Sequence, residues 1–374
     1  MQYLIVILDR NSVPFCSYET GGRTGGLIPI DVLQKAVNFA VRNNLSINFL
    51  YGDEPLPPEY ETAIEDADHV KMVSLRHAGR YPDAVFVVDG PADKEYIHLL
   101  ENNGINNVIL RIGRTQIGSL ASAVRGLIGK FKRLNIILKD LHGMKDEDLL
   151  LYSGQLSRVR KIMEDEYRKK NFMEINAISD RVFLTNMNNC SAGTRHMTVA
   201  PNGKFYLCPA FYYDDEENCF GSLDGALNIK NPQLLELEYA PVCQRCDAWH
   251  CKRCLYLNRK LTCELNTPSR EQCVVAHLER DQSRIFIDNI GTETGLTRQV
   301  SAIPPLDYRD PFEVLSDRSL STLEKEEHFS GLLAKPLEGV SFKDLFRQIY
   351  SIDPQIIVRL KDLNYSPVDL ENEE

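Results

Sequence analysis

The chain has 374 residues, of which 43% are hydrophobic and 26% are charged, as in ordinary globular proteins. Its 43 basic and 53 acidic residues give a net charge of -10. This balance argues against nucleic acid as a partner, because nucleic-acid binding depends on basic side chains that neutralise phosphates. No stretch has the roughly 18 uncharged apolar residues of a membrane helix, and the first residues lack the pattern of a signal peptide. We therefore expect a cytoplasmic protein without membrane contact.

Strand-like runs recur through the first half of the chain and are rich in Val, Ile, Leu and Phe, as buried parallel strands are. They are residues 3–9, 47–51, 69–73, 84–89, 107–112, 135–139 and 172–176. Amphipathic runs separate several of them, at residues 30–43, 92–103, 114–133 and 145–170. This alternation, without a nucleotide-fingerprint loop, predicts a full or partial (β/α) barrel over residues 1–185. A doubly wound open sheet is the alternative.

The cysteines are concentrated in one later segment. Nine of the ten lie between residues 190 and 273, and Cys16 alone precedes them. Thiols stay reduced in the cytoplasm, so a disulfide framework is not expected. The segment is irregular and rich in Asn, Gly, Pro and aromatic residues, so metal ligation has to replace a large apolar core. We expect a small metal domain over residues 186–285, and a linker and helical segment over residues 286–374.

Two cysteine groupings define the expected metal domain. Cys190 and Cys208 flank the turn PNGK, which contains Gly203 and predicts a β-hairpin that brings the two thiols together. The run CQRCDAWHCKRC, residues 243–254, holds two C-x-x-C pairs separated only by DAWH. A four-cysteine zinc site usually has about fifteen to twenty residues between its pairs. The short gap therefore favours iron–sulfur clusters, and zinc stays the alternative. Within DAWH, His250 is not expected to be a ligand, and Trp249 is expected to shield a cluster from water.

The full cysteine pattern resembles the SPASM domain, the auxiliary-cluster module of many radical SAM peptide-modifying enzymes. It reads Cys190, Gly203, Cys208, then Cys243-x2-Cys246-x4-Cys251-x2-Cys254, then Cys273, with the last two internal spacings each one residue shorter than in the family. The resemblance implies two 4Fe-4S clusters. Cys190, Cys208 and Cys254 would serve the first, and Cys243, Cys246, Cys251 and Cys273 the second. Cys219, as a fourth ligand of the first cluster, and Cys263 are further candidates; a small buried side chain is the alternative for both.

A SPASM domain normally follows a partial α/β barrel whose first strand leads into C-x3-C-x-aromatic-C. The corresponding loop here runs from Ser12 to Glu19, in which Cys16 and the aromatic Tyr18 match, while Ser12 and Glu19 replace two cysteines. The family's GGEP motif, which holds the amino group of S-adenosylmethionine, corresponds to Tyr51-Gly52-Asp53-Glu54-Pro55. The resemblance thus places a degenerate cofactor and cluster site at Cys16, Gly52, Asp53 and Glu54. Because a reducing four-iron cluster needs thiolate ligands, we expect the catalytic cluster to be lost.

Longer stretches resemble the CXXX repeat peptide maturases over about residues 1–285. These are LDRNSVPFCSYE, LIPIDVLQKAV and CKRCLYLNRKLTCELNTPSREQC. The resemblance implies a role in maturing a ribosomally made cysteine-repeat peptide. The chain would be the catalyst, or an electron-transfer or scaffold subunit beside an active partner enzyme.

Two other functions stay open on the sequence. One is a non-catalytic binding module stabilised by zinc, and the other is an active radical SAM enzyme with irregular ligands. Linear order predicts no catalytic triad. His69, His77, His98 and His142 are expected to be surface or core histidines.

Overall fold

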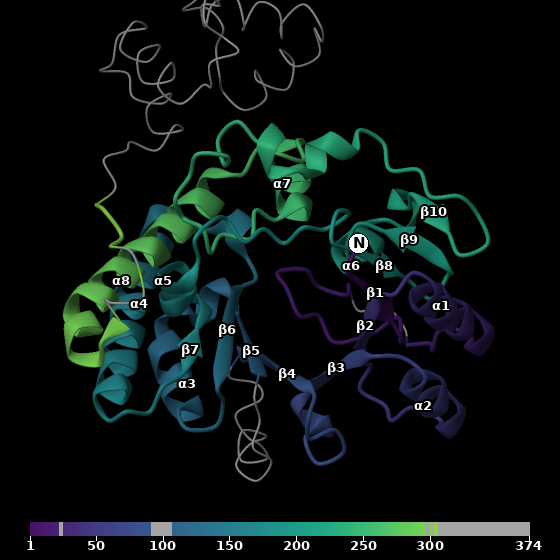
Figure 1. Ribbon diagram of the computed structural model, residues 1–374, viewed down its shortest axis with the longest axis horizontal. Coiled ribbons are helices and arrows are strands. Elements are labelled where there is room, and N and C mark those ends of the chain that lie inside the picture. The colour runs from purple at the N-terminus through teal and green to yellow at the C-terminus, as the bar shows by residue number, and fades with distance from the viewer. Residues whose placement is uncertain (22–24, 91–106, 297–299, 301, 306–374) are drawn as a thin grey trace, which may run out of the picture. The chain divides into compact units, whose positions relative to one another are not determined.

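One mixed sheet of ten strands organises the described part of the protein, as the computed structural model in Figure 1 shows. The structure describes residues 1–21, 25–90, 107–296, 300 and 302–305. All of them belong to one unit, Met1–Tyr308. The strand order is β10-β9-β8-β1-β2-β3-β4-β5-β6-β7.

The first seven strands lie side by side in chain order and are parallel. They are β1 (Tyr3–Ile7), β2 (Ser46–Leu50), β3 (His69–Ser74), β4 (Val85–Asp89), β5 (Asn107–Ile112), β6 (Arg133–Leu138) and β7 (Glu174–Ile175). Each coincides with a strand-like run of the sequence. The strand order of a doubly wound sheet reverses part-way, whereas this order does not. The predicted α/β fold, with strands arranged as in a partial (β/α) barrel, is therefore confirmed.

Helices connect several of these strands and pack apolar faces against the sheet. They include α1 (Ile30–Arg42), α2 (Pro58–Glu65), α3 (Leu120–Leu127) and α4 (Asp146–Arg168). In α1 the buried residues Leu33, Ala36, Val37 and Ala40 recur at helical spacing, as predicted. The predicted helix at 114–133 is shorter, because a 3-10 turn, η3 (Arg114–Ser119), precedes α3, and Gly129 adopts a left-handed φ of 82°. The run at 92–103 lies outside the described residues.

The expected metal segment contributes three strands to the same sheet. These are β8 (His196–Val199), β9 (Lys204–Tyr206) and β10 (Gly221–Ser222). Strand β8 lies parallel to β1, and β9 runs antiparallel to β8 with Val199 opposite Phe205. Gly203, with a φ of 72°, turns the chain between them, so the predicted hairpin at PNGK is confirmed. The sheet thus joins the cysteine-rich segment directly to the barrel strands.

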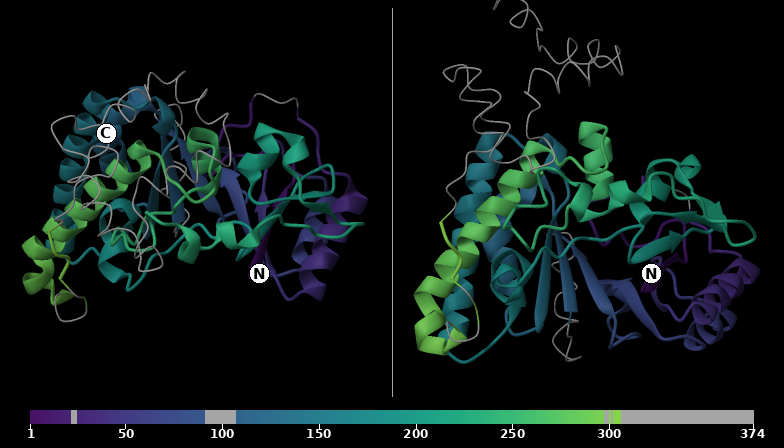
Figure 2. Two further views of the ribbon diagram at one scale, coloured as in Figure 1. Left: turned by 90° about the horizontal axis from the view of Figure 1, so that it is seen from above. Right: turned by 45° about the horizontal axis from the view of Figure 1, so that its top comes forward.

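The remaining helices follow β7 and the hairpin. They are α5 (Arg181–Phe183), α6 (Pro209–Asp214), α7 (Leu255–Thr262) and α8 (Arg270–Thr294). Short helical turns are η1 (Leu75–His77), η4 (Leu141–Gly143), η5 (Asn176–Asp180), η6 (Glu216–Asn218), η7 (Pro232–Leu235) and η8 (Leu237–Tyr239). Helix α8 lies along α4 (Figures 1 and 2). It runs through residue 285, the predicted end of the metal domain, and continues to Thr294, within the range predicted as a linker and helical segment. The expected C-terminal helical segment lies outside the described residues.

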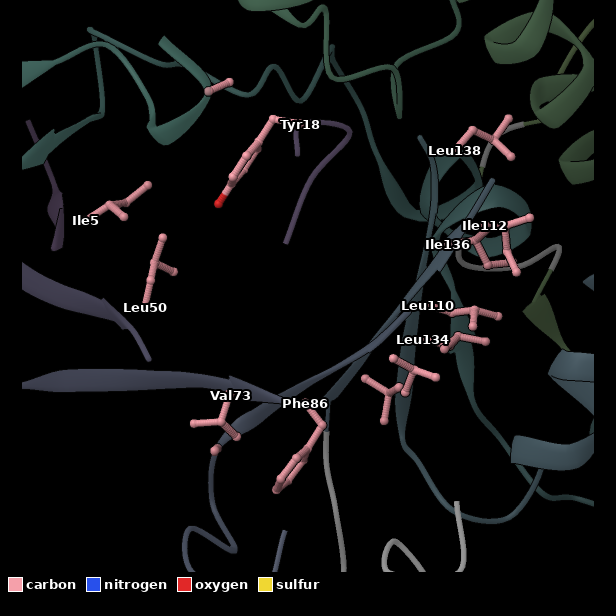
Figure 3. Packing of buried hydrophobic residues seen from close by; sticks show 14 of the residues in the cluster. Ile5, Tyr18, Leu50, Val73, Phe86, Leu110, Ile112, Leu134, Ile136 and Leu138 are labelled. Atoms are coloured by element: carbon pink, nitrogen blue, oxygen red, sulfur yellow. The ribbon is translucent and has the colours of Figure 1, made fainter. Parts of the chain in front are cut away.

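The apolar core follows the strands from β1 to β6. Figure 3 shows Phe86, Leu110 and Ile136 among its buried side chains, and Tyr18 pointing from the loop after β1 toward the side of the sheet that carries Ile5 and Leu50. The loop after β1 is therefore packed against the sheet rather than exposed. In the part of the chain that the structure describes, no helix is both long and apolar enough to cross a membrane.

Candidate metal centre

Three cysteines of the predicted pattern come together where the hairpin, α6 and α7 meet. Cys208 precedes the first residue of α6, and Cys254 precedes the first residue of α7. The two helices pack through the rings of Phe211 and Tyr256, whose centroids lie 5.7 Å apart. The backbone N–H of Cys190 donates to the carbonyl of Lys252 at 2.8 Å, which fixes Cys190 beside the segment that leads to Cys254.

Cys16 lies with these three cysteines, although the sequence placed it at the degenerate cofactor site. Every pair among Cys16, Cys190, Cys208 and Cys254 interacts electrostatically, and we call these four residues the first thiol group. Burial, and then the negative charge of neighbouring thiolates, raises the pKa of Cys16 and Cys208 well above the usual value and that of Cys254 to about 12.

A second thiol group consists of Cys243, Cys246 and Cys251. Burial raises the pKa of Cys243 and of Cys246 to about 12, and the charges of neighbouring cysteines of the group raise it further. Burial also raises the pKa of Cys251. The Cys246 Sγ lies 3.6 Å from His277 Nε2 on α8. Cys273, the fourth predicted ligand of this group, lies one turn before His277 on the same helix.

Arg253 lies between the two thiol groups. Its side chain interacts electrostatically with Cys243 and Cys251 of the second group and with Cys190 of the first. It is only 3% exposed, and one Nη donates to the carbonyl of Leu235. Its Nε and other Nη are buried and have no hydrogen-bond partner among the described residues. A buried cation with unused donors beside seven thiols needs negative acceptors, which thiolates and the sulfides of a cluster would provide.

Two buried arginines anchor the loop of the second thiol group. Asp247 accepts from Arg280 of α8 at 2.6 Å, and the backbone carbonyl of Asp247 accepts from Arg181 of α5. The Arg181 guanidinium also stacks on Trp249 at 3.8 Å from the ring centroid. His250 Nε2 lies 3.1 Å from a carboxylate oxygen of Glu279, so this nitrogen is engaged with α8. Residues of α5 and α8 thus hold this loop in position independently of the cysteines.

The two further candidate cysteines lie outside both groups. Cys219 is half-buried after η6, where its charge acts on Tyr206. Cys263 is exposed at the end of α7, with a left-handed φ of 61°.

The degenerate loop after β1 is tied to the protein by its own side chains. The hydroxyl oxygens of Ser12 and Tyr213 lie 2.8 Å apart, and Tyr18 stacks on Tyr213 with ring centroids 5.5 Å apart. Glu19 accepts from Arg111 at 2.9 Å and lies 3.4 Å from Lys139. The two residues that replace family cysteines thus have protein partners.

Arg111 on β5 is the centre of this arrangement. Its side chain is fully buried and donates to Asp89 at 2.7 Å and to the backbone carbonyls of Cys16 and Tyr18 at 2.9 and 2.7 Å. The guanidinium therefore fixes the backbone on both sides of Ser17. The sequence contains a signal for this role of Arg111, which is the only charged residue in the apolar run NVILRI. A charge in a buried strand is normally paired, so the run could have indicated a buried ionic contact.

The residues that match GGEP have different surroundings. The Gly52 carbonyl lies 3.0 Å from Nε2 of the buried His77, and a Cβ at Gly52 would come within 2.9 Å of Asp9 Cβ. Asp53 and Glu54 are exposed, and Asp53 lies 3.6 Å from Arg76. Gly52 is thus a close-packed turn residue.

The other histidines singled out in the sequence have ordinary environments where they are described. His69 is half-buried, with Nδ1 2.8 Å from the Ala67 carbonyl, and His142 is exposed. His98 lies outside the described residues.

The donor chemistry of both groups fits a thiophilic metal centre. Within the described ranges, no three His, Cys, Asp or Glu side chains are arranged to hold a single metal ion. The fit rests on the donors themselves: neighbouring thiols, most of them half-buried, repel one another as thiolates and are stabilised when iron supplies the opposing positive charge. The residues that would hold clusters are Cys190, Cys208 and Cys254, and Cys243, Cys246, Cys251 and Cys273.

Similarity to known proteins is structural. No protein-family model and no curated protein matches the chain. Solved structures of anSMEcpe do match it. Native anSMEcpe with bound AdoMet aligns at 11% identity and a TM-score of 0.56, over 77% of this chain and 99% of that one. A hexahistidine-tagged form with AdoMet aligns at 13% identity and a TM-score of 0.57, over 78% of this chain and 100% of that one. A complex with AdoMet and the Cp18Cys peptide aligns at 13% identity and a TM-score of 0.56, over 78% of this chain and 99% of that one.

The chain shares the fold of anSMEcpe, a mixed α/β fold with a large parallel sheet. anSMEcpe is an anaerobic sulfatase-maturating radical SAM enzyme. The alignment covers nearly its whole length, so the likeness extends beyond the barrel strands. At this level of identity it establishes the fold, and the chemistry of this chain has to be argued from its own residues.

Proposed function

We propose that this chain is a peptide-maturation protein of the radical SAM/SPASM type that carries two 4Fe-4S clusters and has no S-adenosylmethionine-cleaving cluster of its own. It would act on or with a cysteine-repeat ribosomal peptide. The gathering of mostly half-buried thiols into two separate groups carries this proposal. Such clusters transfer electrons when bound, and the surrounding protein binds and orients the other reactants.

The contacts of the degenerate loop support the absence of a cleaving cluster. Glu19 is paired with Arg111 and Lys139, and Ser12 with Tyr213, so neither side chain is free to replace a missing thiolate. The Gly52 carbonyl is engaged by His77. This leaves an electron-transfer or scaffold role beside an active enzyme as the role that the site supports best.

A peptide as the partner is supported by the fold and by charge. In one of the similar structures, anSMEcpe holds AdoMet and the Cp18Cys peptide. Strand β10 ends the sheet order on one side, and an extended peptide could bind such an edge through main-chain hydrogen bonds. The net charge of -10 favours a peptide with a neutral or basic leader.

Metal and sulfide analysis tests the cofactor part of the proposal. Anaerobically reconstituted protein should contain about eight iron and eight sulfide per chain. Cys246→Ser should lose about half of both, because it removes one thiolate of the second thiol group. The matched control is Cys263→Ser, which changes an exposed cysteine outside both groups. Stoichiometric zinc without sulfide would instead support the zinc-stabilised binding module.

Calorimetric titration tests the partner. We expect a cysteine-repeat peptide, chosen from a gene beside the coding region, to bind in the micromolar range or tighter, about -8 kcal/mol. The same peptide with serine in place of each cysteine is the control for recognition of the thiols. Absence of binding to protein with intact clusters would leave a general redox role.

A further inference from the structure

We propose that Cys16 is the fourth protein ligand of the first cluster, so that a cysteine of the degenerate radical SAM loop completes a site in the cysteine-rich segment. This inference rests on the proposed function, because it presumes that the first thiol group holds a cluster. The sequence pattern supplies three thiols for that cluster, whereas a 4Fe-4S cluster takes four. It offered Cys219 as the fourth.

The contacts of the loop after β1 bring Cys16 to the start of α6. Ser12 and Tyr18 flank Cys16 in the sequence, and both contact Tyr213, by a 2.8 Å hydrogen bond and by ring stacking. Tyr213 belongs to α6, which begins directly after Cys208. Two contacts from one loop to one short helix therefore hold Cys16 and Cys208 near each other.

Arg111 fixes the backbone of Cys16 from the barrel side. It donates to the Cys16 carbonyl at 2.9 Å and to the Tyr18 carbonyl at 2.7 Å. The arginine thus holds the main chain of the loop, and neither of these bonds occupies the Cys16 thiol. This contact joins β5 to the loop, so the position of Cys16 is set by the barrel as well as by α6.

The electrostatic contacts among the cysteines agree with this placement. Cys16 interacts with Cys190 and Cys254, and Cys208 interacts with all three others. Charges of buried groups act on one another strongly only at short range. The charge of Cys219 acts on Tyr206. All six pairs among Cys16, Cys190, Cys208 and Cys254 interact in this way, so Cys16 completes a set of four thiols.

The test compares two serine variants of the full chain after anaerobic reconstitution. Cys16→Ser should lose up to half of the iron and sulfide, or give the electron paramagnetic resonance signal of a three-iron cluster, while the second cluster is retained. Cys219→Ser should match the wild type in iron content and spectrum. Cys16→Asp, which offers a carboxylate ligand, should recover iron relative to Cys16→Ser but with an altered spectrum.

The outcomes separate this inference from the proposed function. If the wild type holds about eight iron and Cys16→Ser keeps all of it with an unchanged spectrum, Cys16 is not a ligand and the proposed function stands. If the wild type holds no iron or sulfide, both are overturned. Misfolding of Cys16→Ser would remove both clusters, whereas loss of a ligand removes iron from one and leaves the signal of the other.

Discussion

Replacing Arg111 with methionine should destabilise the protein and release the loop that carries Cys16. The Arg111 side chain has no exposed surface, whereas its partners Glu19 and Asp89 are 55% and 40% exposed. Water can therefore replace the arginine at the two carboxylates, and their loss contributes little. The carbonyls of Cys16 and Tyr18 lose their donor, and an unsatisfied buried acceptor costs about 1–3 kcal/mol. We expect the free energy of unfolding to fall by about 2–4 kcal/mol in total.

Anaerobic calorimetry measures this effect. For a chain of this size, about 2–4 kcal/mol corresponds to a fall in the unfolding midpoint of roughly 3–5 °C. Iron content should also fall, because the loop no longer holds Cys16 in place. The matched control is Arg114→Met, which removes an arginine that is 38% exposed and pairs with Asp148 at 2.7 Å. That pair should contribute below about 1 kcal/mol. Equal midpoints for the two variants would refute this account of Arg111.

Four further results are expected. In chemical denaturation, Gly52→Ala should lower the free energy of unfolding by about 1–3 kcal/mol, because the new Cβ would lie 2.9 Å from Asp9 Cβ. The control Gly126→Ala, in a helix with open space around the glycine, should be neutral or stabilising. Equal effects of the two variants would contradict the steric argument. Burial lowers the pKa of His196 to about 4. As the pH falls below about 6.5, His196 therefore binds a proton in the unfolded state but not in the folded state, which favours unfolding. The free energy of unfolding should fall by about 3 kcal/mol by pH 4. His196→Gln should flatten that part of the stability profile, and an unchanged profile would refute the assignment. Arg253→Met should make the cluster reduction potentials more negative in a redox titration, because the variant removes a buried positive charge near both thiol groups. Arg253→Lys keeps the charge and should give potentials between those of Arg253→Met and the wild type. Equal potentials in all three proteins would exclude this role of Arg253. Incubation with S-adenosylmethionine and a strong reductant should give no 5′-deoxyadenosine above a protein-free control, and clear turnover would mean that irregular ligands suffice.

Local patterns of the sequence were sufficient for the strands of the barrel and for the hairpin. Runs of Val, Ile and Leu predicted β1 to β7 because burial in a parallel sheet requires apolar side chains on both faces. Gly203 predicted a turn because it adopts a positive φ without strain. Helix boundaries were less accurate. The run at 114–133 was predicted as one helix, whereas the structure has the 3-10 turn η3 followed by the shorter helix α3. Helix α8 packs on α4, which lies more than a hundred positions earlier in the chain, and such a contact cannot be predicted from a local pattern.

The cysteine spacing by itself determined that nine thiols would gather in one segment and that soft metal chemistry would suit them. Only the tertiary structure decided which thiols are neighbours. Most of the barrel separates Cys16 from Cys190 in the sequence, and the contacts of Ser12 and Tyr18 with Tyr213 of α6 bring the loop of Cys16 to the first thiol group. The roles of Arg111 and Arg253 also depend on contacts between distant segments. Spacing along a chain specifies which groups can reach one another locally, whereas burial and long-range pairing specify which of them share a site, and these arise only when the sheet is assembled.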